Sequence, residues 1–330
     1  MELMNISPKI KMKDLMKQPE FGNVGKYVLY TPGFLGMMMG GITLEKQEAS
    51  GWNHDSIIYG LSRLREVVQA GEALYPVYSD SECADDKAKK DVNVVFFPKK
   101  EDRGPKPFVL LCAGGAYSSV CSAVEAYPVM ARFNELGYDA FALTYRVGGK
   151  KLLPKPLDDL AAALIMILSR REQFGISEEY VVGGFSAGAS LISIFGTDNH
   201  GYMTYGLPKP KALIPVYTFI NHTLFGSSPV MKFCLSTMFG RKPSETLLEE
   251  YDVDTHMSRD YPPCYIVCGK DDSTVPPVNS EHLKECLDSR SIPAVLEEGE
   301  HAEHGFGDGR ATSVEGWIDR ADAFIMSLSV

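Results

Sequence analysis

The chain has 330 residues, of which 45% are hydrophobic and 23% charged, and its formal net charge is −10. These proportions are ordinary for a globular protein with a full core, and the length allows one large α/β domain or two smaller ones. The negative charge argues against nucleic acid or an anionic membrane as the main partner. Seven cysteines without zinc-ligand spacing favour a reduced, cytoplasmic protein.

The first 70 residues predict a partly helical arm or lid. Apolar residues recur at helical spacing over 56–70, which predicts one amphipathic helix. An apolar stretch at 27–44 approaches the length of a membrane span, but Pro32 and four glycines interrupt it. We interpret that stretch as a lid or pocket-lining loop with adaptable methionines. No secretory signal is visible at the N-terminus.

From residue 71 to residue 330 the pattern predicts one domain of alternating strands and helices. Continuous apolar runs are typical of parallel strands that are buried on both faces, so the sheet is expected to be open and mostly parallel with helices on both faces. The segment 219–261 breaks the alternation, and we expect it to be an insertion over the carboxyl edge of the sheet. The predicted strands are 74–78, 92–97, 108–112, 140–145, 180–182, 212–217, 265–268 and 294–298, and the predicted helices of this domain include 124–136, 156–170, 189–195 and 314–328.

One predicted strand runs into the sequence Gly-Phe-Ser-Ala-Gly around Ser186. A nucleophile on a sharp strand-to-helix turn has a strained backbone, so small residues are needed two positions before and after it. The following helix offers N–H groups and a positive dipole end where an oxyanion would form. Ser186 is therefore a candidate nucleophile, although a five-residue pattern can also be an ordinary glycine-rich turn.

A catalytic serine needs a base to take its proton and an acid to orient that base. Both residue types follow Ser186 in the required order, each directly after a predicted strand. The acid is Asp271 or Asp272, and the base is His301 or His304.

A glycine-rich loop at 112–117 follows the first core strand. Such a loop can turn backbone N–H groups toward a reacting carbonyl. Four elements in this order, each at the carboxyl end of a strand, favour a catalytic site over chance.

These segments resemble the α/β-hydrolase fold, and within it the esterase/lipase group related to hormone-sensitive lipase and the bacterial acetyl esterases. The resemblance extends from about residue 74 to residue 330. The oxyanion loop departs from the family's H-G-G-G motif, with Ala113 at the histidine and Ala116 at the third glycine. The matching segments are 112–117, 184–188, 272–276 and 304–306.

The resemblance implies Ser186 as nucleophile, His304 as base and Asp272 as orienting acid. It favours Asp272 over Asp271 because the family's acid stands three residues before the valine of D-x-x-V-P. It favours His304 over His301 because the family's histidine precedes Gly-Phe.

The resemblance also implies that the N–H groups of Gly115, Ala116 and Ala187 form an oxyanion hole. Tyr117 and Phe185 are candidates for the substrate pocket. No cofactor or metal is implied. The expected partner is a small ester, without nucleic acid or stable membrane insertion, and homo-oligomerisation is left open.

The sequence thus predicts a serine carboxylic-ester hydrolase that acts through an acyl-enzyme. The resemblance implies short-chain, acetyl-type esters, including acetylated sugars. One alternative is a serine peptidase of the prolyl-oligopeptidase type, although 70 residues of arm are few for its extra domain. Another is a non-catalytic protein that binds a small ligand on the same scaffold, which would typically have lost one member of the triad.

Overall fold

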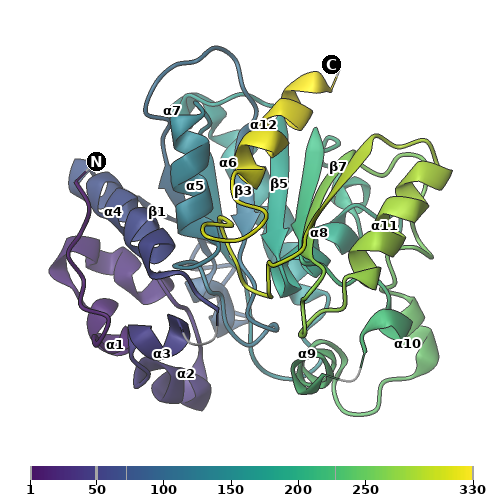
Figure 1. The fold of residues 1–330 in the computed structure, drawn as a ribbon, viewed down its shortest axis with the longest axis horizontal. Helices are drawn as coiled ribbons and strands as arrows, with labels where there is room; N and C mark the ends of the chain where they lie inside the picture. The colour runs from purple at the N-terminus through teal and green to yellow at the C-terminus, as the bar shows by residue number, and fades with distance from the viewer. Residues whose placement is uncertain (1, 49–50, 72, 227, 329–330) are drawn as a thin grey trace.

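A computed structural model describes residues 2–48, 51–71, 73–226 and 228–328. Within these residues eight strands form one sheet in the order β1-β2-β4-β3-β5-β6-β7-β8 (Figure 1). β2 pairs antiparallel with β1 and β4, and the other neighbours are parallel. The predicted α/β-hydrolase fold is therefore confirmed. The strands are β1 (Leu74–Pro76), β2 (Asn93–Phe97), β3 (Phe108–Cys112), β4 (Ala140–Thr144), β5 (Tyr180–Phe185), β6 (Ala212–Val216), β7 (Cys264–Gly269) and β8 (Ala294–Gly299).

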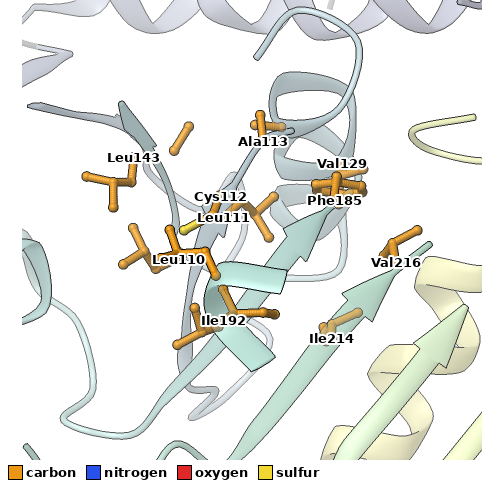
Figure 2. Packing of buried hydrophobic residues seen from close by; sticks show 14 of the residues in the cluster. Leu110, Leu111, Cys112, Ala113, Val129, Leu143, Phe185, Ile192, Ile214 and Val216 are labelled. Atoms are coloured by element: carbon orange, nitrogen blue, oxygen red, sulfur yellow. The ribbon is translucent and has the colours of Figure 1, made fainter. Parts of the chain in front are cut away.

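The central strands are apolar because the sheet is covered on both faces. Every residue of β3, β5, β6 and β7 is buried. Figure 2 shows apolar side chains of β3, β5, β6 and α8 gathered around the middle of the sheet, among them Leu110, Phe185, Ile192 and Ile214. Burial of this core fixes the strand ends that carry the candidate site.

Helices cover both faces of the sheet (Figure 1). α5 and α12 pack against each other on one face, and α6 and α8 lie together on the other. The helices that follow β2 along the chain are α5 (Ala126–Glu135), α6 (Lys155–Ser169), α7 (Arg171–Phe174), α8 (Ala187–Phe195), η3 (Tyr202–Tyr205), η4 (His222–Leu224), α9 (Pro229–Phe239), α10 (Glu245–Glu249), α11 (Val278–Ser289) and α12 (Trp317–Ser327).

The N-terminal arm is mostly helical. Its longest helix, α4, has Asn53 as N-cap, whose side chain accepts the Ser56 N–H at 3.0 Å, and it packs against α5. In the described part of the chain, no helix is long and apolar enough to cross a membrane. The role of the arm as a lid stays a prediction. The elements before β2 include α1 (Met12–Leu15), η1 (Pro19–Tyr27), α2 (Gly33–Gly40), α3 (Leu44–Glu48), α4 (His54–Ala70) and η2 (Lys87–Asp91).

A buried ion pair ties the chain after β4 to helix α6. Arg146 and Asp159 have side chains only 5% and 0% exposed, and their Nη2 and Oδ1 atoms lie 2.8 Å apart. Asp159 also accepts the Arg146 N–H at 2.7 Å and the Tyr78 hydroxyl at 2.8 Å. The carboxylate is thus fully hydrogen-bonded in a dry environment.

Replacing Asp159 by alanine should lower the free energy of unfolding by about 3 kcal/mol, because it leaves a buried guanidinium without its main partner. Urea denaturation measures this loss. Asp288→Ala is the matched control, since Asp288 forms an exposed ion pair with Lys284 and such pairs contribute less than about 1 kcal/mol. Equal losses in the two variants would show that the buried ion pair contributes no more to stability than an exposed one.

Candidate active site

Ser186 occupies the turn between β5 and α8. Its backbone lies at φ 52° and ψ −117°, a conformation that few residues other than glycine adopt. A Cβ atom on Gly184 would lie 2.3 Å from the Gly188 carbonyl oxygen, and one on Gly188 would lie 2.0 Å from the Cys112 carbonyl oxygen. The two glycines are therefore required by close approach of the backbone.

His304 and Asp272 reach Ser186 from the loops after β8 and β7. The His304 Nε2 atom lies 2.9 Å from Ser186 Oγ, and its Nδ1 atom lies 2.8 Å from Asp272 Oδ2. The other Asp272 oxygen accepts the N–H groups of Thr274 and Val275, each at 2.8 Å. Because Nδ1–H donates its hydrogen bond to the Asp272 carboxylate, the Nε2 atom is left without a proton and can accept one from the serine.

The two rival residues form a separate pair. The His301 side chain is 90% exposed, and its Nδ1 atom lies 3.7 Å from Asp271 Oδ2. Asp271 also accepts the Ala302 N–H at 2.8 Å. The structure thus brings Asp272 and His304 to Ser186 and holds Asp271 and His301 in a neighbouring loop contact.

Three backbone N–H groups near Ser186 have no intramolecular acceptor among the described residues, namely those of Gly115, Ala116 and Ala187. Gly115 and Ala116 have φ of 131° and 51°, and both line the same cavity as Ser186. Ala187 is the first residue of α8, where N–H groups are free to bind an anion. These are the three donors that the resemblance implied for an oxyanion hole.

A cavity of about 510 Å³ opens above Ser186 and His304. Its walls come from the N-terminal arm, from Val230 in the segment 219–261 and from the loops that follow the parallel strands. This is the edge where open α/β sheets bind ligands. The lining residues are Gly51, Trp52, Gly115, Ala116, Glu125, Ser186, Val230, Ser273, Thr274, Glu303, His304 and Gly305.

Several residues predicted for the pocket lie elsewhere. The side chain of Tyr117 is 0% exposed, and its ring contacts that of Tyr145. The side chain of Phe185 is 1% exposed, and its ring contacts those of Tyr217 and Trp317. Both are core residues and do not line the cavity.

Two methionines of the arm also lie away from the cavity. Met37 and Met38 in α2 are 76% and 59% exposed and point to the surface. From the arm, Gly51 and Trp52 line the cavity instead.

Three residues of the site escaped the sequence interpretation. Trp52 lines the cavity, and Glu125 lines it while accepting the Tyr217 hydroxyl at 3.0 Å. Tyr217 lies under the His304 ring, with ring centroids 4.7 Å apart. A signal for Glu125 was present, because it is the single charge in the apolar run 120–131 that leads into α5. Trp52 and Tyr217 gave no such signal.

A second cavity, of about 920 Å³, lies at the amino-terminal ends of the strands, opposite the edge that carries Ser186. Prolines before β6, β7 and β8 line it together with charged side chains such as Lys209 and Glu179. No serine, cysteine or histidine is among its lining residues in the described chain. It therefore does not compete with the Ser186 cavity as a site of nucleophilic catalysis.

The BD-FAE family model matches residues 94–287, more than half of the chain. The chain belongs to the BD-FAE family. It is 25% identical over 254 residues to LipM of Mycobacterium tuberculosis, a probable carboxylic ester hydrolase, and covers 57% of that protein. It is also 25% identical over 195 residues to endo-1,4-beta-xylanase B of Butyrivibrio fibrisolvens, of which it covers 30%. The chain thus spans about half or less of the length of these curated relatives.

Among solved structures, this BD-FAE chain is similar to an acetyl ester-xyloside bifunctional hydrolase from Caldicellulosiruptor lactoaceticus. The TM-score is 0.68 at 24% identity, and the match covers 77% of this chain and 96% of the other. The match bears on the fold alone. Together with the family match it supports the α/β-hydrolase esterase/lipase group expected from the motifs.

Proposed function

We propose that this protein is a serine carboxylic-ester hydrolase that acts through an acyl-enzyme on short-chain, acetyl-type esters. The observation that carries the proposal is the continuous contact from Ser186 through His304 to Asp272 at the floor of a cavity. This contact also argues against the non-catalytic alternative, because a protein that only binds a ligand has no need of a hydrogen-bonded serine, imidazole and carboxylate in this order.

In the first half of the reaction, Ser186 Oγ attacks the ester carbonyl while His304 Nε2 takes its proton. Asp272 holds the imidazole in the tautomer that can accept this proton and stabilises the imidazolium. The C–O bond then breaks as His304 returns the proton to the leaving alcohol. A water molecule, deprotonated by His304, then attacks the acyl-serine. As the bond from the acyl carbon to Oγ breaks, His304 returns the proton to Ser186 Oγ, which releases the carboxylic acid and restores the free serine.

The oxygen of each tetrahedral intermediate would be bound by the N–H groups of Gly115, Ala116 and Ala187. Backbone donors fixed in advance need no reorganisation when negative charge develops, which is why they stabilise a transition state by several kcal/mol. The free N–H groups at these positions support this assignment, and the altered motif at Ala113 and Ala116 keeps the backbone donors.

The substrate class is proposed to be small acetyl esters, with acetylated carbohydrates as the natural form. Two relatives support it, since one is named as a xylanase and the other as an acetyl ester-xyloside hydrolase. Among the described lining residues, Trp52 offers an indole ring in the same cavity as polar groups of Ser273, Thr274 and Glu303. An aromatic face can pack on the apolar face of a sugar ring while polar groups bind its hydroxyls.

Trp52→Ala is expected to raise KM for an acetylated xylo-oligosaccharide about tenfold, a loss of about 1.4 kcal/mol of binding. The effect on nitrophenyl acetate should be under about threefold, because that substrate gives the indole no sugar ring to contact. Initial rates on both substrates measure the difference. Phe233→Ala is the control, since Phe233 is an exposed aromatic residue of α9 outside the cavity. Equal changes on both substrates would contradict a sugar-binding role.

A substrate panel tests the function as a whole. Nitrophenyl esters of increasing acyl length should be hydrolysed fastest at acetate and butyrate, and proline-containing amides should not be cleaved. Faster cleavage of the amides would favour the peptidase alternative. No turnover of any ester, acetylated sugars included, would favour the non-catalytic alternative.

A further inference from the structure

Glu125 is an enclosed carboxyl group at the edge of the cavity. It lies at the end of the loop that joins β3 to α5 and is 5% exposed. One carboxylate oxygen accepts the Gly114 N–H and the other accepts the Tyr217 hydroxyl. Among the described residues, no lysine or arginine forms an ion pair with Glu125, and the nearby titratable side chain whose charge lowers its pKa is that of His304. A buried carboxyl group without a cationic partner is costly to keep, so its place beside a reactive serine calls for a reason.

The first contact of Glu125 fixes the start of the oxyanion loop. Gly114 directly precedes Gly115 and Ala116, whose N–H groups are the proposed donors. A Cβ atom on Gly114 would lie 2.8 Å from Ser186 Cβ and 3.2 Å from Glu125 Oε2. The Gly114 peptide is therefore held between the serine turn and the carboxylate, which sets the position of the next two N–H groups.

The second contact of Glu125 reaches the base. Tyr217, which follows β6 with φ 41°, donates its hydroxyl to Glu125 at 3.0 Å. The Tyr217 ring centroid lies 4.7 Å from that of His304 and 4.7 Å from that of Phe306. The carboxylate thus fixes the aromatic ring against which the imidazole packs.

We propose that Glu125 is a positioning residue that couples the oxyanion loop, through Gly114, to His304, through Tyr217. This inference rests on the proposed ester hydrolysis and goes beyond it, because the triad and the oxyanion donors do not themselves require a second acid. Glu125 acts through these neighbours and takes no proton from the substrate.

The charge state of Glu125 decides how well it accepts both hydrogen bonds. Burial raises its pKa from 4.5 to about 7, opposed by the Gly114 N–H, His304 and the Tyr217 hydroxyl. Among the described residues, Cys121 and Tyr145 are further titratable groups that interact with Glu125. Burial raises the pKa of Cys121 to about 12 and those of Tyr145 and Tyr217 well above 10, so these three stay neutral near pH 7.

The raised pKa of Glu125 has a definite sign in the stability of the protein. A carboxyl group whose pKa is higher in the folded state stabilises the fold fully below about pH 4.5, and this contribution is lost as the pH rises to about 7. The ionised form that accepts both hydrogen bonds is therefore the form that the fold tolerates least. Replacing the carboxyl by an amide should remove this pH dependence.

Glu125→Gln and Glu125→Ala separate charge from shape. The glutamine amide can accept the Gly114 N–H and donate to the Tyr217 oxygen, whereas alanine loses both contacts. We expect kcat on nitrophenyl acetate to fall about tenfold in Glu125→Gln and about 100-fold in Glu125→Ala, with KM changed less than about threefold. In Tyr217→Phe, which keeps the ring and loses one hydrogen bond, kcat should fall about fivefold.

Two pH measurements distinguish positioning from a merely structural role. The acidic limb of the kcat profile should move to lower pH in Glu125→Gln, because that side chain no longer takes up a proton. The difference in Tm between Glu125→Gln and the wild type should shift in favour of the variant by about 4 °C when the pH is raised from 5 to 8, because the wild type loses stability over this range. Asp139→Asn is the matched control, since Asp139 is a buried carboxyl with a burial-raised pKa that accepts the Lys99 N–H at 3.0 Å, away from the cavity.

Glu125→Gln with wild-type kcat, in an assay where the wild type hydrolyses esters, would overturn the inference and leave the proposed function standing. The inference would also be overturned if kcat fell in Glu125→Gln while its pH profile stayed unmoved and its Tm difference from the wild type did not vary with pH. A wild type that hydrolyses no ester would overturn the proposed function, and this inference with it.

Discussion

Ser186→Ala is expected to lower kcat on a short-chain ester by at least about 10⁴-fold and to abolish labelling by a fluorophosphonate probe. The probe reacts with a serine whose proton can be taken by a neighbouring base, and the Ser186 Oγ to His304 Nε2 distance of 2.9 Å provides that base. Oxyanion donors and binding alone would account for the rate that remains. Steady-state kinetics and gel fluorescence of the labelled protein measure the two effects.

Ser169→Ala is the matched control for this experiment. Ser169 lies at the end of α6, away from the described lining of the cavity, and its hydroxyl donates to the Met166 carbonyl oxygen at 2.8 Å. That variant should be labelled like the wild type. Labelling that survives in Ser186→Ala, or a wild type that resists the probe under conditions that label other serine esterases, would contradict the nucleophile assignment.

His304→Ala and Asp272→Asn are expected to lower kcat by about 10⁴-fold each, because one removes the base and the other leaves the imidazole in the wrong tautomer. Their neighbours provide unusually close controls. His301→Ala removes an imidazole three residues before His304, and Asp271→Asn replaces a carboxylate one residue before Asp272. Both should keep kcat within about threefold, since the His301 side chain is 90% exposed and lies 3.7 Å from Asp271.

The double variant His304→Ala/Asp272→Asn tests whether the two residues act as a unit. If they do, its kcat should be close to that of His304→Ala rather than the product of the two losses. Additive losses, or a larger effect of the His301 or Asp271 variant than of its partner in the proposed triad, would overturn the assignment.

Most of the fold could be predicted from the sequence because local patterns decide it. The apolar run at 108–112 forms β3, which is buried along its whole length, and the helical spacing at 56–70 lies within α4. The boundaries differ by a few residues at helix ends; the last helix, for example, begins at Trp317 rather than at 314. Hydrophobic periodicity fixes the type of an element more strongly than its ends.

The cavity was less accessible to sequence reasoning. Trp52 comes from the N-terminal arm and Val230 from helix α9, far apart in the chain, and both line the cavity above Ser186. Tyr117 and Phe185 lie next to candidate catalytic residues in the sequence but are buried in the core. Along a strand or a tight turn neighbouring side chains point in opposite directions, so proximity in sequence does not place a residue at the cavity.

The sequence by itself determined the strand-and-helix alternation and the serine turn, because each depends on residues close together in the chain. It also determined the order of acid and base, because each of these residues directly follows a strand that can be recognised locally. The resemblance favoured Asp272 and His304 over their neighbours, and the tertiary structure brings these two side chains to Ser186. Only the tertiary structure showed that Glu125 lies between Gly114 and Tyr217. These contacts join residues 32 to 118 positions apart, or pass through a buried loop. The geometry of these contacts is set by the order in which the strands pair in the sheet and not by any local sequence pattern.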